Sequence, residues 1–200
     1  MEPDTVEIRV LGCLLEKQRT TPDAYPLSLN ALRVACNQAT NRDPVVEYDE
    51  ATVVEALRRL ALRGWTRLAS GAGSRARKYR HLLGDALELD DAEQSLLAVL
   101  MLRGTQTPGE LKQRTDRLHG FADLAAVHGA LEQLIEKGHV ERLPRQPGKK
   151  EERYRQLLGG EEDAADNGGA VGEESRLDRL ERELAELREQ VRELRDALGG

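Results

Sequence analysis

Residues 63–68, Arg-Gly-Trp-Thr-Arg-Leu, have a counterpart in residues 137–143, Lys-Gly-His-Val-Glu-Arg-Leu. In both stretches a glycine separates an apolar pattern of helical period from a short extended pattern, and Gly138 follows Gly64 by 74 residues. A glycine at this point predicts a helix that ends in a left-handed residue and a strand that begins directly after it. Because this junction occurs twice, it indicates that one structural unit is repeated.

The stretches after these junctions are also similar. Residues 78–83 read Lys-Tyr-Arg-His-Leu-Leu and residues 153–158 read Arg-Tyr-Arg-Gln-Leu-Leu, and Tyr154 follows Tyr79 by 75 residues. The spacing is therefore kept within one residue, which two copies of one fold explain. The first copy runs from about residue 5 to 83 and the second from about residue 90 to 158.

Each copy has three helical patterns followed by a strand, a turn and a strand. In the first copy, Ser28 and Asp49 are suited to cap the second and third helices, and residues 25–27 can form only a short edge strand or an extended link. In the second copy, the pairs Asp90 with Glu93 and Thr107 with Glu110 predict capping boxes. Three helices and a hairpin are the winged-helix arrangement, so the predicted fold class is mainly α, an α+β winged helix in two tandem copies.

The C-terminal part differs from both copies. Glycine and acidic residues alternate over 159–174, which predicts a flexible acidic linker. Residues 175–198 follow a heptad pattern, which predicts a coiled-coil helix, and the flanking charges favour a parallel homodimer over a helix that docks on its own globular part. The predicted organisation is a winged-helix domain over 1–84, a second over 85–158, the linker and this helix. The predicted dimerisation residues are Leu177, Leu180, Leu184, Leu187, Val191, Leu194 and Leu198.

Composition limits the classes of protein that fit. Hydrophobic residues make up 39% of the chain and aromatic residues 3%, which predicts small aliphatic cores rather than one large core. The net charge is −6, but residues 1–84 carry 13 basic and 10 acidic side chains, so the first copy is mildly basic. The acidic N-terminus and the short apolar run at 96–102 predict neither a secretory signal nor a membrane span. Cys13 and Cys36 read as buried, reduced thiols, and we expect a soluble cytoplasmic protein.

Several motifs in the first copy are similar to those of a known family. They are residues 10–18 (VLGCLLEKQ), 20–32 (TTPDAYPLSLNAL), 35–38 (ACNQ) and 41–45 (NRDPV). On these motifs the chain resembles the YceH-like family of bacterial proteins, which is of uncharacterised function, and the resemblance extends to about residue 158. It implies a tandem winged-helix fold, and it brings no catalytic residues with it.

No set of residues in the sequence points to catalysis. The four histidines are scattered, and none pairs with cysteine or carboxylates at metal-ligand spacing. Residues 71–73, Gly-Ala-Gly, precede a strand rather than a helix, so they lack the helix dipole that a phosphate-binding loop uses. We therefore expect a non-enzymatic protein that has no cofactor and no metal.

The predicted function is DNA binding by a transcription-regulator-like protein whose basic wings contact phosphates of double-stranded DNA. Acidic residues early in both third helices argue against it, so a dimeric protein–protein scaffold or accessory subunit without direct DNA binding stays open as the alternative. For Arg42, one interpretation is a phosphate contact, and the other is a structural pair with a nearby acid. The candidate nucleic-acid-binding residues are Arg75, Arg77, Lys78, Arg80, Arg145, Lys149, Lys150 and Arg42.

Overall fold

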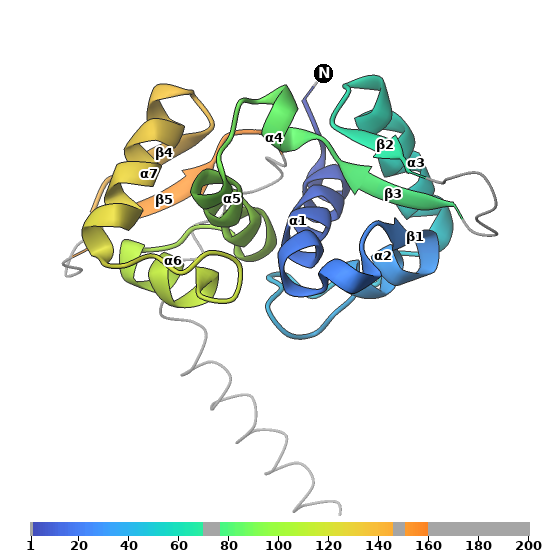
Figure 1. Ribbon diagram of the computed structural model, residues 1–200, viewed down its shortest axis with the longest axis horizontal. Helices are drawn as coiled ribbons and strands as arrows, with labels where there is room; N and C mark the ends of the chain where they lie inside the picture. The colour runs from blue at the N-terminus through green and yellow to red at the C-terminus, as the bar shows by residue number, and fades with distance from the viewer. Residues whose placement is uncertain (1, 70–76, 146–150, 160–200) are drawn as a thin grey trace, which may run out of the picture. The chain divides into compact units, whose positions relative to one another are not determined.

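The computed structural model describes residues 2–69, 77–145 and 151–159, and these form a mainly helical α+β protein with small antiparallel sheets (Figure 1). All of them belong to one compact unit. The predicted linker beyond Gly159 and the predicted coiled-coil helix over 175–198 lie outside the described residues.

The first half has three helices and a three-stranded sheet. Its elements are α1 (Thr5–Thr20), the 3₁₀ turn η1 (Pro22–Ala24), β1 (Leu27–Ser28), α2 (Leu29–Cys36), α3 (Glu50–Leu62), β2 (Thr66–Leu68) and β3 (Lys78–His81). The strand order is β1-β3-β2, and both pairings are antiparallel. Both predicted caps are confirmed, because the side chain of Ser28 accepts a bond from the Ala31 amide and that of Asp49 from the Thr52 amide.

After a short connecting helix, the second half repeats the three helices and the two hairpin strands, without a 3₁₀ turn or a strand between its first two helices. The elements are α4 (Leu83–Ala86), α5 (Asp91–Arg103), α6 (Pro108–Thr115), α7 (Leu124–Glu136), β4 (Val140–Leu143) and β5 (Arg153–Gln156). The two predicted capping boxes, at the starts of α5 and α6, are confirmed. An isolated β-bridge between Gln106 and Tyr154 corresponds to the pairing of β1 with β3 in the first half. The sequence patterns did not predict α4.

The junctions between the third helix and the following strand have the same geometry in both halves. Gly64 and Gly138 each have φ of +74°, the left-handed conformation that glycine adopts without steric cost. Beyond each glycine the backbone makes matching hydrogen bonds: Trp65 N to Leu60 O (3.0 Å), His139 N to Leu134 O (2.9 Å), Leu82 N to Trp65 O (2.7 Å) and Leu157 N to His139 O (2.8 Å).

A buried glutamate ties the first helix of each half to the end of its third helix. Glu7 completes a capping box with Asp4, and Glu93 completes one with Asp90, yet each glutamate is only 1% exposed. The carboxylate of Glu7 lies 3.4 Å from Nε of Arg63 at the end of α3. That of Glu93 lies 2.7 Å from Nζ of Lys137 at the end of α7. In both halves, an ion pair between a buried glutamate and a cation therefore links the start of the first helix to the end of the third helix.

Helices α1 and α5 lie side by side and join the halves (Figure 1). They approach closely at Gly12, where an added Cβ would lie 2.9 Å from Cγ of Leu102. The buried apolar side chains of both halves belong to one cluster, so the expectation of separate small cores is wrong. The physical reason is that α1 and α5 are buried around most of their circumference, from Ile8 to Leu15 and from Leu96 to Leu102.

We expect Lys137→Met to lower the free energy of unfolding by about 2 kcal/mol, because it leaves the Glu93 carboxylate buried without its cation. Urea denaturation followed by circular dichroism measures this change. Arg117→Met is the matched control, since Arg117 is an exposed cation with no ion pair among the described residues, and we expect its effect to stay within about 0.5 kcal/mol. Equal midpoints for the two variants would contradict a structural role for the Glu93 pair.

Candidate nucleic-acid interface

The first hairpin, formed by β2 and β3, carries three arginines, two of which lie opposite each other on one face of its sheet. In the register of this pair, Arg67 lies directly opposite Arg80, while Thr66 lies opposite His81. Thr66 and His81 are buried, so the alternation of side chains along a strand puts Arg67 and Arg80 on the other face. Arg77 is exposed directly before β3, and by the same alternation it follows the side of His81 rather than that of Arg80. The three arginines Arg67, Arg77 and Arg80 are called the first-hairpin cluster below.

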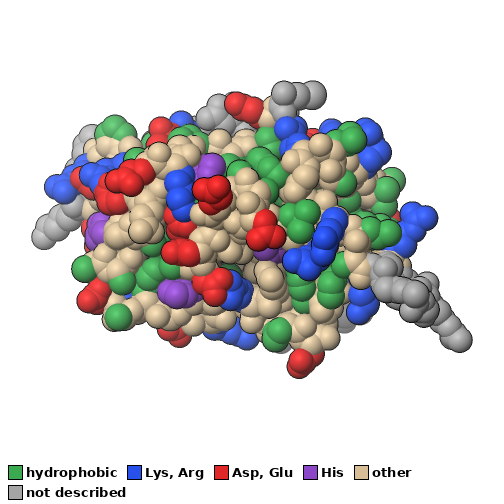
Figure 2. Space-filling model, turned by 45° about the horizontal axis from the view of Figure 1, so that its top comes forward, with side chains coloured by type: hydrophobic (Ala, Val, Ile, Leu, Met, Phe, Trp, Pro, Cys, Tyr) green, Lys and Arg blue, Asp and Glu red, His purple; other side chains and the backbone are tan. Residues whose placement is uncertain are grey.

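None of the three arginines forms an ion pair with a carboxylate of the described residues. Like charges opposite each other in an antiparallel pair are destabilising, and the cost falls when an anion binds between them. In Figure 2 basic side chains gather over the right-hand part of the molecule, where β3 lies in Figure 1. The cluster is therefore suited to hold a phosphate or another anion.

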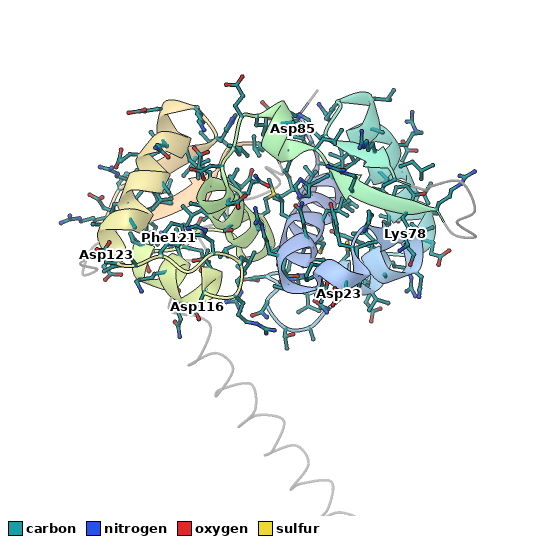
Figure 3. The ribbon with its side chains drawn as sticks, viewed as in Figure 1. Asp23, Lys78, Asp85, Asp116, Phe121 and Asp123 are labelled. Carbon is teal, nitrogen blue, oxygen red and sulfur yellow. The ribbon has the colours of Figure 1, made fainter. Side chains whose placement is uncertain are left out.

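Lys78 lies on the same hairpin, opposite Ser28 of β1, and Figure 3 places it at the outer end of β3. Arg75 lies outside the described residues. Arg67 is absent from the basic residues predicted from the sequence, although it stands in the quoted stretch 63–68. Its importance comes from the strand register, which sets it opposite Arg80 and which the sequence alone does not fix.

The second hairpin, formed by β4 and β5, carries basic residues that are neutralised by acids. Arg142 pairs with Glu132 and Glu152, Arg145 lies 3.5 Å from Glu152, and Arg155 pairs with Glu141. Lys149 and Lys150 lie outside the described residues. Among the predicted nucleic-acid-binding residues of this hairpin, Arg145 alone is described, and its partner Glu152 reduces the attraction that it offers to phosphate.

Arg42 lies inside the first half. Its side chain is 0% exposed, and two of its nitrogens bond the Glu16 carboxylate at 3.0 and 2.6 Å. The remaining donors reach the backbone oxygens of Ala35 and Asn41 and the side chain of Gln38. This position agrees with the structural interpretation, in which Arg42 pairs with an acid. We therefore leave Arg42 out of the nucleic-acid interface proposed below.

The third helices present little positive charge to solvent. The exposed residues of α3 between Ala51 and Leu62 include one basic residue, Arg58, and its guanidinium pairs with Glu55 at 2.7 Å. Helix α7 contains no lysine or arginine, and it exposes Glu132 and Glu136. Neither helix can therefore attract phosphates by its own charge.

His81 anchors the first hairpin to α1. Its Nδ1 accepts a bond from the Leu83 amide (3.3 Å), and its Nε2 contacts Oε1 of Gln18 on α1. The backbone amide of His81 donates to the Tyr25 hydroxyl at 2.9 Å. Burial lowers the pKa of His81 to about 4, and the nearby charges of Arg80 and Arg19 act in the same direction. His81 is therefore neutral at pH 7.

Other kinds of site find no support among the described residues. Histidine, cysteine and acidic side chains form no cluster of metal-binding size in this part of the chain. None of the helices over the described ranges is long and apolar enough to cross a membrane. The predicted dimerisation residues between 177 and 198 lie outside the described residues.

The fold and this surface define the chain as a mainly helical α+β protein with a basic hairpin. The chain belongs to the family described as "Protein of unknown function, DUF480", which matches residues 4–149. It is 49% identical over 195 residues to a UPF0502 protein of Geotalea uraniireducens, covering 92% of this chain and 89% of that protein. It is 47% identical over 210 residues to a UPF0502 protein of Cronobacter sakazakii, covering 97% and 96%. The family resemblance predicted from residues 10–45 is confirmed.

We expect the free energy of unfolding to fall by about 2 kcal/mol between pH 7 and pH 5 because of His81. The pKa of His81 is below its ordinary value of 6.5 in the folded state, so only the unfolded chain takes up this proton in that range. Urea denaturation at a series of pH values measures the dependence. His81→Gln should flatten it, and the exposed His128→Gln should leave it as in the wild type. A slope that His81→Gln leaves unchanged would refute this assignment.

Proposed function

We propose that the two halves are winged-helix domains, with the first hairpin as wing one and the second hairpin as wing two. The shared order of three helices and two hairpin strands, the matching left-handed glycines and the matching contacts of Leu27 and Gln106 with the last strand of each half support this proposal. The domain limits at residues 84 and 158 stay predictions. Because α1 and α5 share one core, we expect the two domains to move as one body.

We further propose that the chain is a non-enzymatic protein that binds the phosphate backbone of double-stranded DNA through wing one. The single observation that carries this function is the first-hairpin cluster, whose three arginines have no carboxylate partner among the described residues. Guanidinium groups are planar donors that match the geometry of phosphate oxygens. We expect wing two to add little to the affinity for DNA, because its charges are paired with acids.

The third helices support contact with phosphates rather than reading of bases. In a winged helix the third helix normally enters the major groove. Specific reading there requires side chains that donate or accept hydrogen bonds at base edges. The exposed side of α3 offers Ala51, Val54 and Ala61 together with a pair of opposite charges that neutralise each other. We therefore expect binding that depends strongly on salt and weakly on DNA sequence.

Fluorescence anisotropy with a labelled mixed-sequence duplex tests this function. We expect binding at about 50 mM salt that weakens steeply as salt rises. The triple variant Arg67→Ala/Arg77→Ala/Arg80→Ala should bind more weakly, and the slope of log affinity against log salt should fall by about 3, one for each lost phosphate contact.

The matched control removes two paired cations of wing two, in Arg142→Ala/Arg145→Ala. This variant should keep most of the wild-type affinity, since Glu152 already offsets these charges. Absence of binding at low salt, or equal losses in both variants, would overturn the assignment to wing one.

A second candidate function, a dimeric protein–protein scaffold or accessory subunit, is favoured by the apolar side of α3. Leu62 is 76% exposed at the end of α3, and Val54, eight residues earlier on the same helix, is 44% exposed. Apolar exposure of this kind is more typical of contact with a protein than with a phosphate backbone. Under this function, no duplex would bind at low salt, and light scattering would give a dimer that a chain ending at Leu158 no longer forms.

A further inference from the structure

The first hairpin carries cations on both faces of its sheet. Its inner face holds the buried Thr66 and His81, and its outer face holds Arg67 and Arg80, which lie opposite each other. Side chains alternate along a strand, so Arg77, three residues before Arg80, follows the inner face. The three arginines of the first-hairpin cluster are therefore divided two to one between opposite faces.

The core covers the inner face only near the base of the hairpin. Thr66 is 3% exposed there, and its hydroxyl donates to the Leu57 carbonyl of α3 at 3.4 Å. Two residues further along β2, on the same face, Leu68 is 52% exposed. Arg77 lies further out again and is exposed. The outer part of the hairpin thus presents the inner face to solvent as well as the outer face.

The charge on both faces is available to an anion. None of the three arginines has an ion pair among the described residues. The neighbours of Arg77 on the inner face, Leu68 and Tyr79, bring no carboxylate. On the outer face, Lys78 adds a further positive charge at the outer end of β3 (Figure 3). Both faces can therefore attract phosphate.

The spacing of the arginines decides which phosphates they can reach. Arg77 and Arg80 are three residues apart, which is roughly 10 Å in an extended strand. A single strand of DNA on the outer face would contact Arg67 and Arg80 and leave Arg77 behind the sheet. The grooves of a duplex are roughly 6 and 12 Å wide, and phosphates of both strands border each groove. A hairpin with cations on both faces fits such a groove, because each face meets its own row of phosphates.

A groove also accounts for the exposure of Leu68. This side chain lies beside Arg77 on the inner face, where water contacts its apolar surface. When the inner face meets the wall of a groove, the sugar rings of that strand remove this apolar surface from water, which is favourable. Contact with DNA through the outer face alone would leave Leu68 in water.

We propose that wing one lies in a groove of duplex DNA and contacts both strands, with Arg67 and Arg80 on the phosphates of one strand and Arg77 on those of the other. This inference rests on the proposed function and adds the form of the substrate. The site requires a duplex, and a single strand occupies only one face of the wing.

The test measures binding of the full-length chain to two duplexes of one mixed sequence by fluorescence anisotropy. The first duplex is native. In the second, called the half-neutral duplex, one strand is replaced by its methylphosphonate analogue, whose backbone carries no charge. The most favourable arrangement there sets Arg67 and Arg80 on the charged strand and Arg77 on the neutral strand. We therefore expect a smaller slope of log affinity against log salt for the wild type on the half-neutral duplex.

Arg77→Ala separates contact with two strands from contact with one. On the native duplex it should lower the slope by about 1, the value of one phosphate contact. On the half-neutral duplex it should leave the slope and the affinity unchanged, because Arg77 faces the neutral strand. Arg67→Ala/Arg80→Ala should lower the slope on both duplexes.

Arg117→Ala is the matched control, because it removes an exposed arginine of the second half. It should bind both duplexes like the wild type. Arg77 is exposed and has no ion pair among the described residues, so we expect Arg77→Ala to fold like the wild type. Urea denaturation of each variant checks this point.

Two results would rule out contact with both strands while DNA binding itself stands. In the first, Arg77→Ala lowers the slope equally on the two duplexes, which assigns all three arginines to one strand. In the second, Arg77→Ala changes the slope on neither duplex, which removes Arg77 from the interface. A different result, no binding to the native duplex at about 50 mM salt, would refute the proposed function as well.

Discussion

The buried carboxylates of Glu7 and Glu93 are the constraint on which the arrangement of both halves depends. Each one caps the first helix of its half and also holds a cation from the end of the third helix. A carboxylate that is 1% exposed is stable only when its charge is matched and its oxygens are bonded. The third helix must therefore end beside the start of the first, and the glycine that follows sends the chain into the hairpin.

The same scaffold supports different surfaces because only the buried positions are shared. The first hairpin places Arg67 opposite Arg80, and neither has an ion pair among the described residues, whereas Arg142 and Arg155 of the second hairpin are paired with glutamates. We interpret the second half as the partner that completes the core through α5, and the first half as the half that carries the proposed DNA contact.

The shared core has consequences for how the protein responds to change. Helix α1 contacts α5 at Gly12 and touches the first hairpin through Gln18 and His81. Close-packed interiors transmit strain, so we expect a change in the packing of α1 to affect both the hairpin and the second half.

The sequence by itself determined the features that depend on neighbours in the chain. The capping boxes at Asp90 and Thr107 and the left-handed Gly64 and Gly138 follow from spacings of a few residues, and local hydrogen bonds decide them. Family membership followed from the motifs over residues 10–45. Only the tertiary structure decided which charges are paired: the burial of Arg42, the lack of an ion pair for Arg9 among the described residues, and the opposition of Arg67 and Arg80. The residues in these contacts are 13 to more than 30 positions apart in the chain. Packing and strand register bring them together, and no local pattern in the sequence does so.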